Sequence, residues 1–304
     1  MKDAPVVSTT HVVGVAEHRG PSLAADYFAL TKPRLNFLVV ATSAAGYYLG
    51  ATHGTEPLPM AMAVAGTALV AGGAAVLNQV YERDTDALMR RTRLRPLPDG
   101  RVAPADARAF GFALSAIGLL LLATRANLLA ASLALATLVV YLAIYTPMKR
   151  RTSIATLVGA VPGALPPLIG WTASHGTVSA GGAALFAIVF LWQIPHFMAI
   201  AWLYRDDYGK AGFPMLPVVD PGGGRAGRQA VVYAAALVPV TLVPALVGVS
   251  GLWYGSIALV IGVALMALAI RFAMTRSDRS ARALFLGSIV YLPLLWIAMI
   301  GDKL

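Results

Sequence analysis

The stretch "PLPMAMAVAGTALVAGGAAVLNQVYERDTDALMRRTRLRPLP", residues 57–98, runs from an apolar segment straight into a dense group of charges. Residues 57–77 contain no Asp, Glu, Lys or Arg, and a helix needs about 20 apolar residues to cross the hydrocarbon core of a membrane. Residues 78–98 then hold three carboxylates and five arginines. The stretch therefore predicts a membrane-spanning helix that ends in a charged site at the membrane surface.

The whole chain has the composition of an integral membrane protein. Of its 304 residues, 58% are hydrophobic and 12% are charged, whereas about 25% are charged in soluble domains. Unpaired backbone groups are too costly in lipid, and these runs are much longer than the ~10 alternating residues of a barrel strand, so the spans are expected to be helices. The predicted spans are residues 35–53, 58–80, 105–123, 127–146, 155–172, 181–203, 229–250, 251–271 and 281–300.

We therefore predict an all-α membrane protein in which residues 31–304 form a single bundle of nine transmembrane helices, preceded by a polar cytoplasmic tail at residues 1–30. The net charge of +10 follows the membrane topology, because Lys and Arg gather in the tail and after the second, fourth, sixth and eighth spans. The positive-inside rule places the N-terminus and these loops in the cytoplasm and the C-terminus outside. This distribution argues against nucleic acid as a partner.

The tail also bears on the compartment. It lacks the Arg- and Ser-rich composition of an organelle transit peptide, so the inner (plasma) membrane of a bacterium is favoured.

Oxygen-bearing side chains form a stripe at the end of the second predicted span. At ~100° per residue, Asn78, Glu82 and Asp86 fall on one face of a helix. Carboxylates at this spacing repel one another, so we expect a bound cation to stabilise them. Oxygen ligands together with a substrate phosphate favour Mg²⁺. The alternative interpretation is that neighbouring arginines simply neutralise these acids.

A second acidic pair, Asp206 and Asp207, directly follows the sixth predicted span. Even-numbered spans end at one membrane face, so this pair is expected on the same side as the stripe. Two oxygen clusters at one face suit a diphosphate bound through Mg²⁺, and guanidinium groups bind phosphate oxygens in bidentate fashion. The sequence contains no G-x-x-x-x-G-K-[ST] pattern, so a nucleotide P-loop is not supported.

These motifs resemble those of the UbiA superfamily of intramembrane prenyltransferases. The resemblance rests on the N-x3-E-x3-D pattern followed by "RRTRLRPLP", and on the acidic segment after the sixth span. "YTPMKRRTSIATLVGAVPGALPPLIGW" (residues 145–171), "WQIPHF" (192–197) and "DDYGKAGFPMLPV" (206–218) are similar to the haem-farnesylating branch. The superfamily usually has N-D-x-x-D-x-x-x-D as its first motif, where this chain has Gln79 and Glu82 in place of the first two Asp residues. Its second motif, D-x-x-x-D, is missing, as is typical of the haem branch.

The resemblance implies a reaction and its requirements. A farnesyl group passes from farnesyl diphosphate to a vinyl group of haem b, water adds, and haem O and diphosphate result. Mg²⁺ is the implied cofactor, haem b being a substrate, and membrane lipid surrounds the protein. A haem A synthase or an oxidase assembly factor is an expected partner.

The resemblance also suggests roles for individual residues. The predicted Mg²⁺ ligands, which together with Lys149 form the predicted catalytic set, are Asn78, Glu82, Asp86, Asp206 and Asp207. The predicted diphosphate contacts are Arg90, Arg91, Lys149, Arg150 and Arg205. For haem we assign His196, as an iron ligand or a porphyrin contact, and Tyr208. The alternative for His196 is a neutral side chain bonded to a neighbouring helix beside the kink expected at Pro195.

Two other functions are considered. A related prenyltransferase acting on an aromatic quinone precursor would use the same leaving-group site, but "DDYGKAGFPMLP" favours the haem branch. A transporter would use buried acids and proline kinks for gating. Its acids would lie near the midplane of the membrane, whereas here they cluster at one face.

Overall fold

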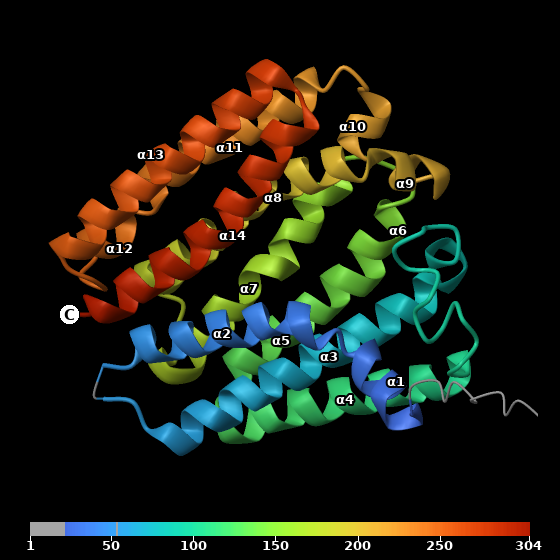
Figure 1. Ribbon diagram of the computed structural model, residues 1–304. Coiled ribbons are helices and arrows are strands. Elements are labelled where there is room, and N and C mark those ends of the chain that lie inside the picture. Colours follow the sequence, from blue (N-terminus) through green and yellow to red (C-terminus); the bar gives the residue numbers. More distant parts are fainter. Residues whose placement is uncertain (1–21, 53) are drawn as a thin grey trace, which may run out of the picture.

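The protein is a bundle of long helices (Figure 1) in this computed structural model, which describes residues 22–52 and 54–304. Within that part of the chain every regular element is helical, and the β contact is a bridge between Ser250 and Lys303. The elements are α1 (Leu23–Leu30), α2 (Pro33–Gly50), α3 (Pro57–Asp86), α4 (Pro104–Arg125), α5 (Leu128–Val139), the π-helix η1 (Val140–Tyr145), α6 (Thr146–Met148), α7 (Ala155–His175), α8 (Ala180–Leu203), α9 (Arg205–Lys210), α10 (Leu216–Val219), α11 (Gly224–Val240), α12 (Val243–Leu246), α13 (Leu252–Thr275) and α14 (Asp278–Gly301).

The predicted fold class is confirmed, and helices coincide with all nine predicted spans. Seven helical segments in the described residues are long and apolar enough to cross a membrane. α2 and α7 coincide with the two other predicted spans but are not among these seven, so the count of nine spans is not confirmed. Of the predicted tail, residues 1–21 lie outside the described residues, while residues 23–30 form α1, whose Leu30 is fully buried.

Helices α2 and α7 pack closely against each other. A Cβ atom on Gly46 of α2 would collide with the Pro167 carbonyl of α7, and one on Gly170 of α7 would collide with the Ser43 carbonyl of α2. Small residues at these positions let the two backbones approach, as is usual for helices packed within membranes. Any larger side chain is therefore excluded at Gly46 and Gly170.

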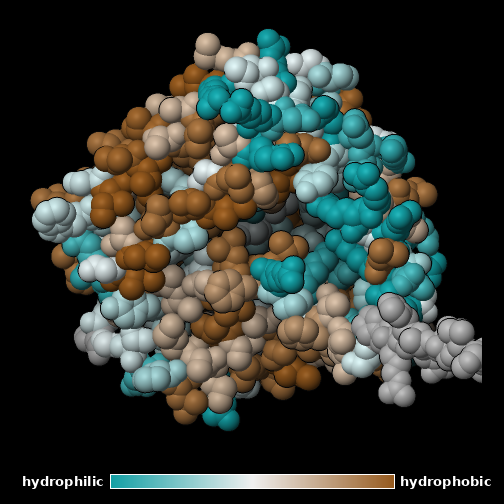
Figure 2. All heavy atoms as spheres, in the orientation of Figure 1, coloured by the Kyte–Doolittle hydropathy of each residue, from teal (hydrophilic) through white to brown (hydrophobic). Residues whose placement is uncertain are grey.

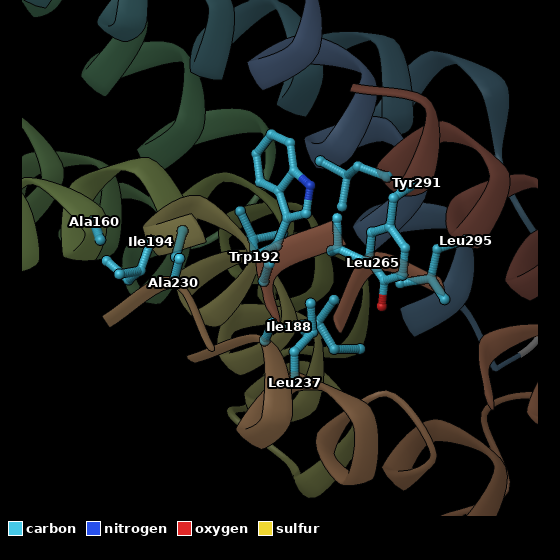
Figure 3. Close-up of a cluster of buried hydrophobic side chains, with 14 of the residues drawn as sticks. Ala160, Ile188, Trp192, Ile194, Ala230, Leu237, Leu265, Tyr291 and Leu295 are labelled. Carbon is cyan, nitrogen blue, oxygen red and sulfur yellow. The ribbon is translucent and has the colours of Figure 1, made fainter. Parts of the chain in front are cut away.

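The largest core cluster surrounds α8, which packs against α7, α11 and α14 (Figure 3). Ile188 and Trp192 of α8 meet Leu237 of α11 and Tyr291 of α14, and all four are buried. Apolar side chains packed around α8 therefore hold α7, α11 and α14 in place.

The two ends of the bundle differ in character. The 87–103 connection, α6 and α9 lie together at the right of Figure 1, while the C-terminus and the α2–α3 connection lie at the left. In the same orientation, hydrophilic side chains gather over the right-hand end (Figure 2). The polar residues predicted to carry the chemistry are thus collected at one end.

Candidate active site

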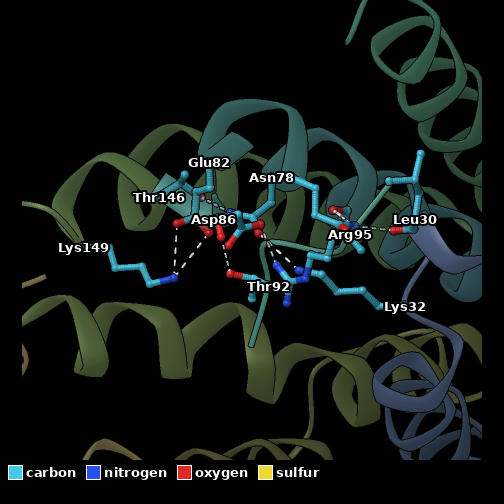
Figure 4. Close-up of polar contacts among 11 residues, drawn as sticks. Leu30, Lys32, Asn78, Glu82, Asp86, Thr92, Arg95, Thr146 and Lys149 are labelled. Atoms are coloured by element: carbon cyan, nitrogen blue, oxygen red, sulfur yellow. Dashed lines mark hydrogen bonds and ion pairs between the residues drawn. The ribbon is translucent and has the colours of Figure 1, made fainter. Parts of the chain in front are cut away.

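Helix α3 continues through Asp86, so the predicted stripe forms. Asn78, Glu82 and Asp86 are 2%, 4% and 2% exposed, and their side chains point into one polar cluster (Figure 4). Almost complete burial distinguishes this stripe from a solvated helix face. Because a buried carboxylate requires a charged or hydrogen-bonding partner, the neighbours of the stripe determine its chemistry.

Each member of the stripe contacts a cation. The Lys149 ammonium lies 3.2 and 3.3 Å from the two oxygens of Glu82. Arg95 donates from Nη1 to Oδ2 of Asp86 over 2.6 Å, and the Lys32 ammonium donates to the amide oxygen of Asn78 over 3.3 Å. The cations come from three different segments of the chain, so the cluster depends on tertiary packing.

Lys32 reaches the cluster from the start of α2. It is the N-cap residue of α2 and has a left-handed backbone conformation with φ 51°. This conformation is rare and strained for a residue with a side chain. Pro33 follows at the first helical position, where its fixed φ suits the helix start. The strained backbone is thus held at a residue whose ammonium group faces the stripe.

The 87–103 connection folds back on the end of α3 to deliver Arg95. The Thr92 hydroxyl donates to the Asp86 carbonyl over 2.7 Å. Met89 of this connection packs with Phe213 and Met215 in a small apolar cluster. These contacts fix the loop that carries the arginine.

The π-helix η1 presents a second row of polar groups. Tyr141 and Tyr145 stack with ring centroids 5.5 Å apart, and Thr146 accepts a hydrogen bond of 3.2 Å from the Asn78 amide. Lys149 follows within the next turn. Single π-turns inside α-helices occur frequently at functional sites, and this one aligns the residues that face α3.

The other predicted diphosphate contacts have different positions. Arg150 donates to the hydroxyl of Thr85, which lies beside Asp86 on α3. Arg90 and Arg91 are exposed in the 87–103 connection, and the Arg91 guanidinium lies 5.1 Å from the centre of the Tyr204 ring. Arg205 is paired with Asp278 of α14 over 2.8 Å. Of these residues, the structure brings Lys149 and Arg150 into the cluster.

The second acidic segment forms the short helix α9. Asp206 is exposed and Asp207 is half-buried. Tyr208 packs edge-on against Phe213, whose ring centre lies 4.7 Å from the Lys149 ammonium. The segment therefore approaches the cluster through its aromatic residues. Within the described residues no hydrogen bond joins its two aspartates to the α3 stripe, and their role as metal ligands stays a prediction.

His196 lies between α8 and α14. Its Nδ1 is 2.8 Å from the Ser288 hydroxyl, and its ring stacks on Trp192 and on Phe285. This hydrogen bond is the one expected of a neutral histidine joined to a neighbouring helix. A contact with haem stays a prediction.

The electrostatics of the cluster favour anions. Four cations (Lys32, Arg95, Lys149 and Arg150) accompany the two carboxylates of the stripe. Burial, reinforced by the nearby charge of Arg95, lowers the pKa of Lys32 to about 8. Burial alone lowers the pKa of Lys149, but the facing Tyr145 hydroxyl and the Glu82 carboxylate raise it, and the net pKa is above the ordinary value. The surplus of positive charge suits a polyanion.

The donor chemistry of the stripe fits Mg²⁺. Asn78, Glu82 and Asp86 offer oxygen atoms, the ligands that Mg²⁺ prefers, and Mg²⁺ commonly uses a few carboxylates together with substrate phosphates. Among the described residues, no group of three or more His, Cys, Asp or Glu side chains could hold a metal ion unaided. Since both carboxylates are paired with cations, the residues fit a metal that arrives with a diphosphate better than a metal alone.

Lys32, Arg95 and Thr146 are site residues that the sequence did not single out. Lys32 and Asn78 are 46 residues apart, and Asn78 and Thr146 are 68 residues apart. No local pattern marks such contacts. The one available signal for Lys32 was its position directly before Pro33 and the first predicted span.

Comparisons with known proteins agree on the family. The UbiA prenyltransferase family matches residues 39–296. A protoheme IX farnesyltransferase of Solibacter usitatus is 45% identical over 287 residues, which cover 91% of this chain and 98% of that protein. One from Anaeromyxobacter sp. is 48% identical over 277 residues, covering 91% and 93%. The mitochondrial protoheme IX farnesyltransferase of Arabidopsis thaliana is 40% identical over 275 residues, covering 90% and 64%.

Solved structures share the fold at low sequence identity. A UbiA homologue from Archaeoglobus fulgidus bound to GPP and Mg²⁺ has a TM-score of 0.63 and 18% identity, covering 91% of this chain and 99% of that one. A structure of digeranylgeranylglyceryl phosphate synthase has a TM-score of 0.79 and 16% identity, covering 92% and 98%. At these identities the similarity shows the fold alone.

Proposed function

Because the chain belongs to the UbiA prenyltransferase family, we propose that it transfers the farnesyl group of farnesyl diphosphate to a vinyl group of protohaem IX. Water adds in the same reaction, and the products are haem O and diphosphate. The observation that carries the proposal is the buried α3 stripe faced by cations at one end of an apolar bundle. Relatives named for this reaction match at least 90% of the chain.

The chain's own residues are assigned to the departing diphosphate. Lys32, Arg95, Lys149 and Arg150 bind its oxygens and disperse the negative charge that develops as the allylic C–O bond breaks. Asn78, Glu82 and Asp86 would hold Mg²⁺, which supplies further neutralisation of that charge when bound. The assignment is supported by the contacts of these cations with α3: Lys32 with Asn78, Arg95 with Asp86, Lys149 with Glu82, and Arg150 with Thr85 beside Asp86.

The allylic fragment must be kept from premature reaction with water. The Phe213 ring faces the Lys149 ammonium, and Tyr141 and Tyr145 stack on each other in the turns just before Lys149. Aromatic faces stabilise cations. A site closed off by such rings also excludes solvent, which strengthens every charge interaction inside it. We assign these three rings to the shielding of the farnesyl carbon.

The remaining assignments extend the proposal. Asp206, Asp207, Arg90, Arg91 and Arg205 stay predicted contacts of the metal–diphosphate complex, and His196 and Tyr208 stay predicted haem contacts. A haem A synthase or an oxidase assembly factor stays a predicted partner. Arg205 is paired with Asp278, so this ion pair must break before Arg205 can contact the diphosphate.

The activity is tested with purified protein, haem b, farnesyl diphosphate and Mg²⁺, with and without a chelator, followed by mass spectrometry of the pigment. We expect a mass gain of one farnesyl group plus one water that disappears with the chelator. If folded protein leaves haem unmodified but prenylates 4-hydroxybenzoate, the proposed diphosphate site would stand and haem b would be the wrong acceptor.

The protein is an integral membrane protein, and we propose that it lies in the inner membrane with the 87–103 connection in the cytoplasm. The chain contains no cysteine, so single cysteines report topology without background. In cells, Leu94→Cys should be protected from an impermeant maleimide while Thr177→Cys, in the α7–α8 connection, is labelled; both positions are exposed. The reverse pattern would invert the orientation.

A further inference from the structure

The link between α1 and α2 determines where Lys32 lies. Helix α1 ends at Leu30 and α2 begins at Pro33, so Lys32 belongs to a two-residue connection. Its φ of 51° is rarely adopted by a residue with a side chain, and such strain persists only where the surroundings fix it. The contacts that fix this connection therefore decide where the Lys32 ammonium points.

Gln79 of α3 makes one of these contacts. Its Nε2 donates to the Leu30 carbonyl over 2.6 Å and to the Ala75 carbonyl, one turn back on α3, over 3.0 Å. An amide nitrogen has two N–H donors, so both are used. Gln79 is 2% exposed and Leu30 is fully buried, and a buried polar group left without its partner is costly. The bond to Leu30 therefore anchors the main chain two residues before Lys32.

The adjacent residue Asn78 contacts the other end of Lys32. Asn78 accepts a hydrogen bond from the Lys32 ammonium over 3.3 Å, and Leu30 and Lys32 lie on the side of the polar cluster away from Lys149 (Figure 4). Neighbouring side chains of α3 thus hold the main chain before Lys32 and the tip of its side chain. Among the described residues Gln79 makes no hydrogen bond to the Lys32 side chain, so it acts on Lys32 through the backbone.

The contact with Leu30 requires a donor at position 79. The partner is a carbonyl oxygen, and an ionised carboxylate offers only further acceptors. Glu or Asp would place an unpaired negative charge against that carbonyl in a buried site, which is costly. Gln79 stands where the superfamily's first motif usually has Asp, and the amide makes a bond there that a carboxylate could not make.

A separate contact attaches α1 to the rest of the protein. Nε of Arg101 lies 3.1 Å from both carboxylate oxygens of Asp26, which is 4% exposed. Asp26 lies in the first turn of α1, and Leu30 is the last residue of that helix. Helix α1 therefore stays attached when the Gln79 bond is lost, and we expect the change to be confined to the connection that carries Lys32.

We propose that Gln79 is a positioning residue for the reaction. Its bond to the Leu30 carbonyl sets the backbone at Lys32 so that the ammonium reaches the diphosphate site. The inference rests on the proposed function in one respect, which is the assignment of Lys32 to the departing diphosphate. It gives Gln79 a role distinct from that of the oxygen ligands on the stripe.

The test is the affinity of the purified full-length protein for inorganic diphosphate with Mg²⁺ present, measured by titration calorimetry. Gln79→Met removes the donors at similar volume, and Gln79→Glu replaces them with acceptors. Lys32→Met removes the ammonium and is also combined with Gln79→Met. Gln193→Met is the matched control, because Gln193 is 6% exposed and its Nε2 also donates to a carbonyl one turn back (Val189, 3.1 Å) and to one on a neighbouring helix (Ala160, 3.0 Å).

We expect Gln79→Met, Gln79→Glu and Lys32→Met each to weaken diphosphate binding about tenfold, the usual effect of losing one hydrogen bond to a charged group. The double variant should bind as Lys32→Met does, within about twofold, because residues that act through one another are not additive. Gln193→Met should bind as the wild type does. Additive losses in the double variant, or an equal loss in Gln193→Met, would overturn the proposal.

Gln79→Glu separates positioning from metal binding. If its diphosphate affinity is undiminished, position 79 serves the metal and the proposal is wrong. The measurement needs no haem, so it stands even if haem farnesylation fails, whereas a wild type that binds no diphosphate would overturn the diphosphate site and this inference together. If Gln79→Met does not fold, Gln79→Asn, which carries the amide on a shorter side chain, decides by the same comparison with Lys32→Met.

Discussion

Glu82 and Lys149 form a buried ion pair, with side chains 6% and 15% exposed. Breaking such a pair by removing one partner leaves an uncompensated charge and costs about 3–5 kcal/mol, whereas removing both partners is often neutral. An ion pair that served stability alone would therefore be dispensable as a unit. The pair offers a direct way to separate a structural from a catalytic role.

We expect Glu82→Gln and Lys149→Met each to lower the thermal inactivation midpoint in detergent and to abolish farnesyl transfer. The double variant should recover most of the stability and none of the activity, because the carboxylate is still missing for the metal and the cation for the diphosphate. If the double variant recovers activity, the Glu82–Lys149 pair has a structural role and no catalytic one.

Asp86 and Asp84 give a matched comparison two residues apart. Asp86 is 2% exposed and pairs with Arg95, while the side chain of Asp84 is 83% exposed and pairs with Arg83 over 3.0 Å. Exposed pairs contribute about 0–1 kcal/mol. Asp86→Asn should abolish product formation, and Asp84→Asn should retain wild-type activity and stability, both measured by turnover per folded molecule. Equal losses in the two variants would contradict a specific site on the stripe.

At the scale of elements, the α2–α7 interface sets the position of Lys32, since Lys32 caps α2. A methyl group at Gly170 would meet the Ser43 carbonyl, so α2 and α7 must move apart. Overpacking of this kind costs about 1–3 kcal/mol. Gly170→Ala should therefore lower the inactivation midpoint and raise the KM for farnesyl diphosphate as Lys32 shifts.

Gly255 of α13 is the control for this substitution. The nearest atom to a new Cβ there is Cβ of Ala245 at 3.7 Å, an ordinary contact. In a helix interior Ala is favoured over Gly by about 1 kcal/mol, so Gly255→Ala should keep or raise stability and leave KM unchanged. If the Gly170→Ala protein is as stable as the Gly255→Ala protein, the α2–α7 interface accommodates an added methyl group and this prediction is wrong.

At the scale of the whole molecule, the balance of charge predicts cooperative binding of metal and diphosphate. Both stripe carboxylates are engaged by cations, so Mg²⁺ alone should bind weakly. We expect bound diphosphate to draw the cations toward itself and free the carboxylates. Ligand at 100 times its dissociation constant stabilises a folded protein by about 2.7 kcal/mol. In thermal shift measurements, Mg²⁺ with diphosphate should therefore stabilise the protein by more than the two separate effects combined.

The control for this cooperativity is Asp86→Asn, which should lose the extra stabilisation and retain the effect of diphosphate alone. A wild-type protein stabilised by Mg²⁺ alone as strongly as by the mixture would indicate a preformed metal site that does not depend on the cations.

The sequence by itself determined the fold class, the approximate ends of the helices and the stripe of Asn78, Glu82 and Asp86. Apolar length and i,i+4 spacing are local properties, and they persist whatever the helices pack against. The termini of α4 and α8 differ from the predicted spans by no more than two residues for this reason.

Only the tertiary structure decided which cations meet the stripe. Lys32 joins it from a segment without a distinguishing pattern, and nothing in the arginine-rich run of residues 90–95 marks Arg95 as the one that meets Asp86. Arg205, which follows α8 directly, pairs with Asp278 73 residues away. Which charged side chains meet depends on how α2, α3 and α7 pack through small residues and on how the 87–103 connection folds back. Such contacts are set by long-range packing and burial, and spacing along the chain does not encode them.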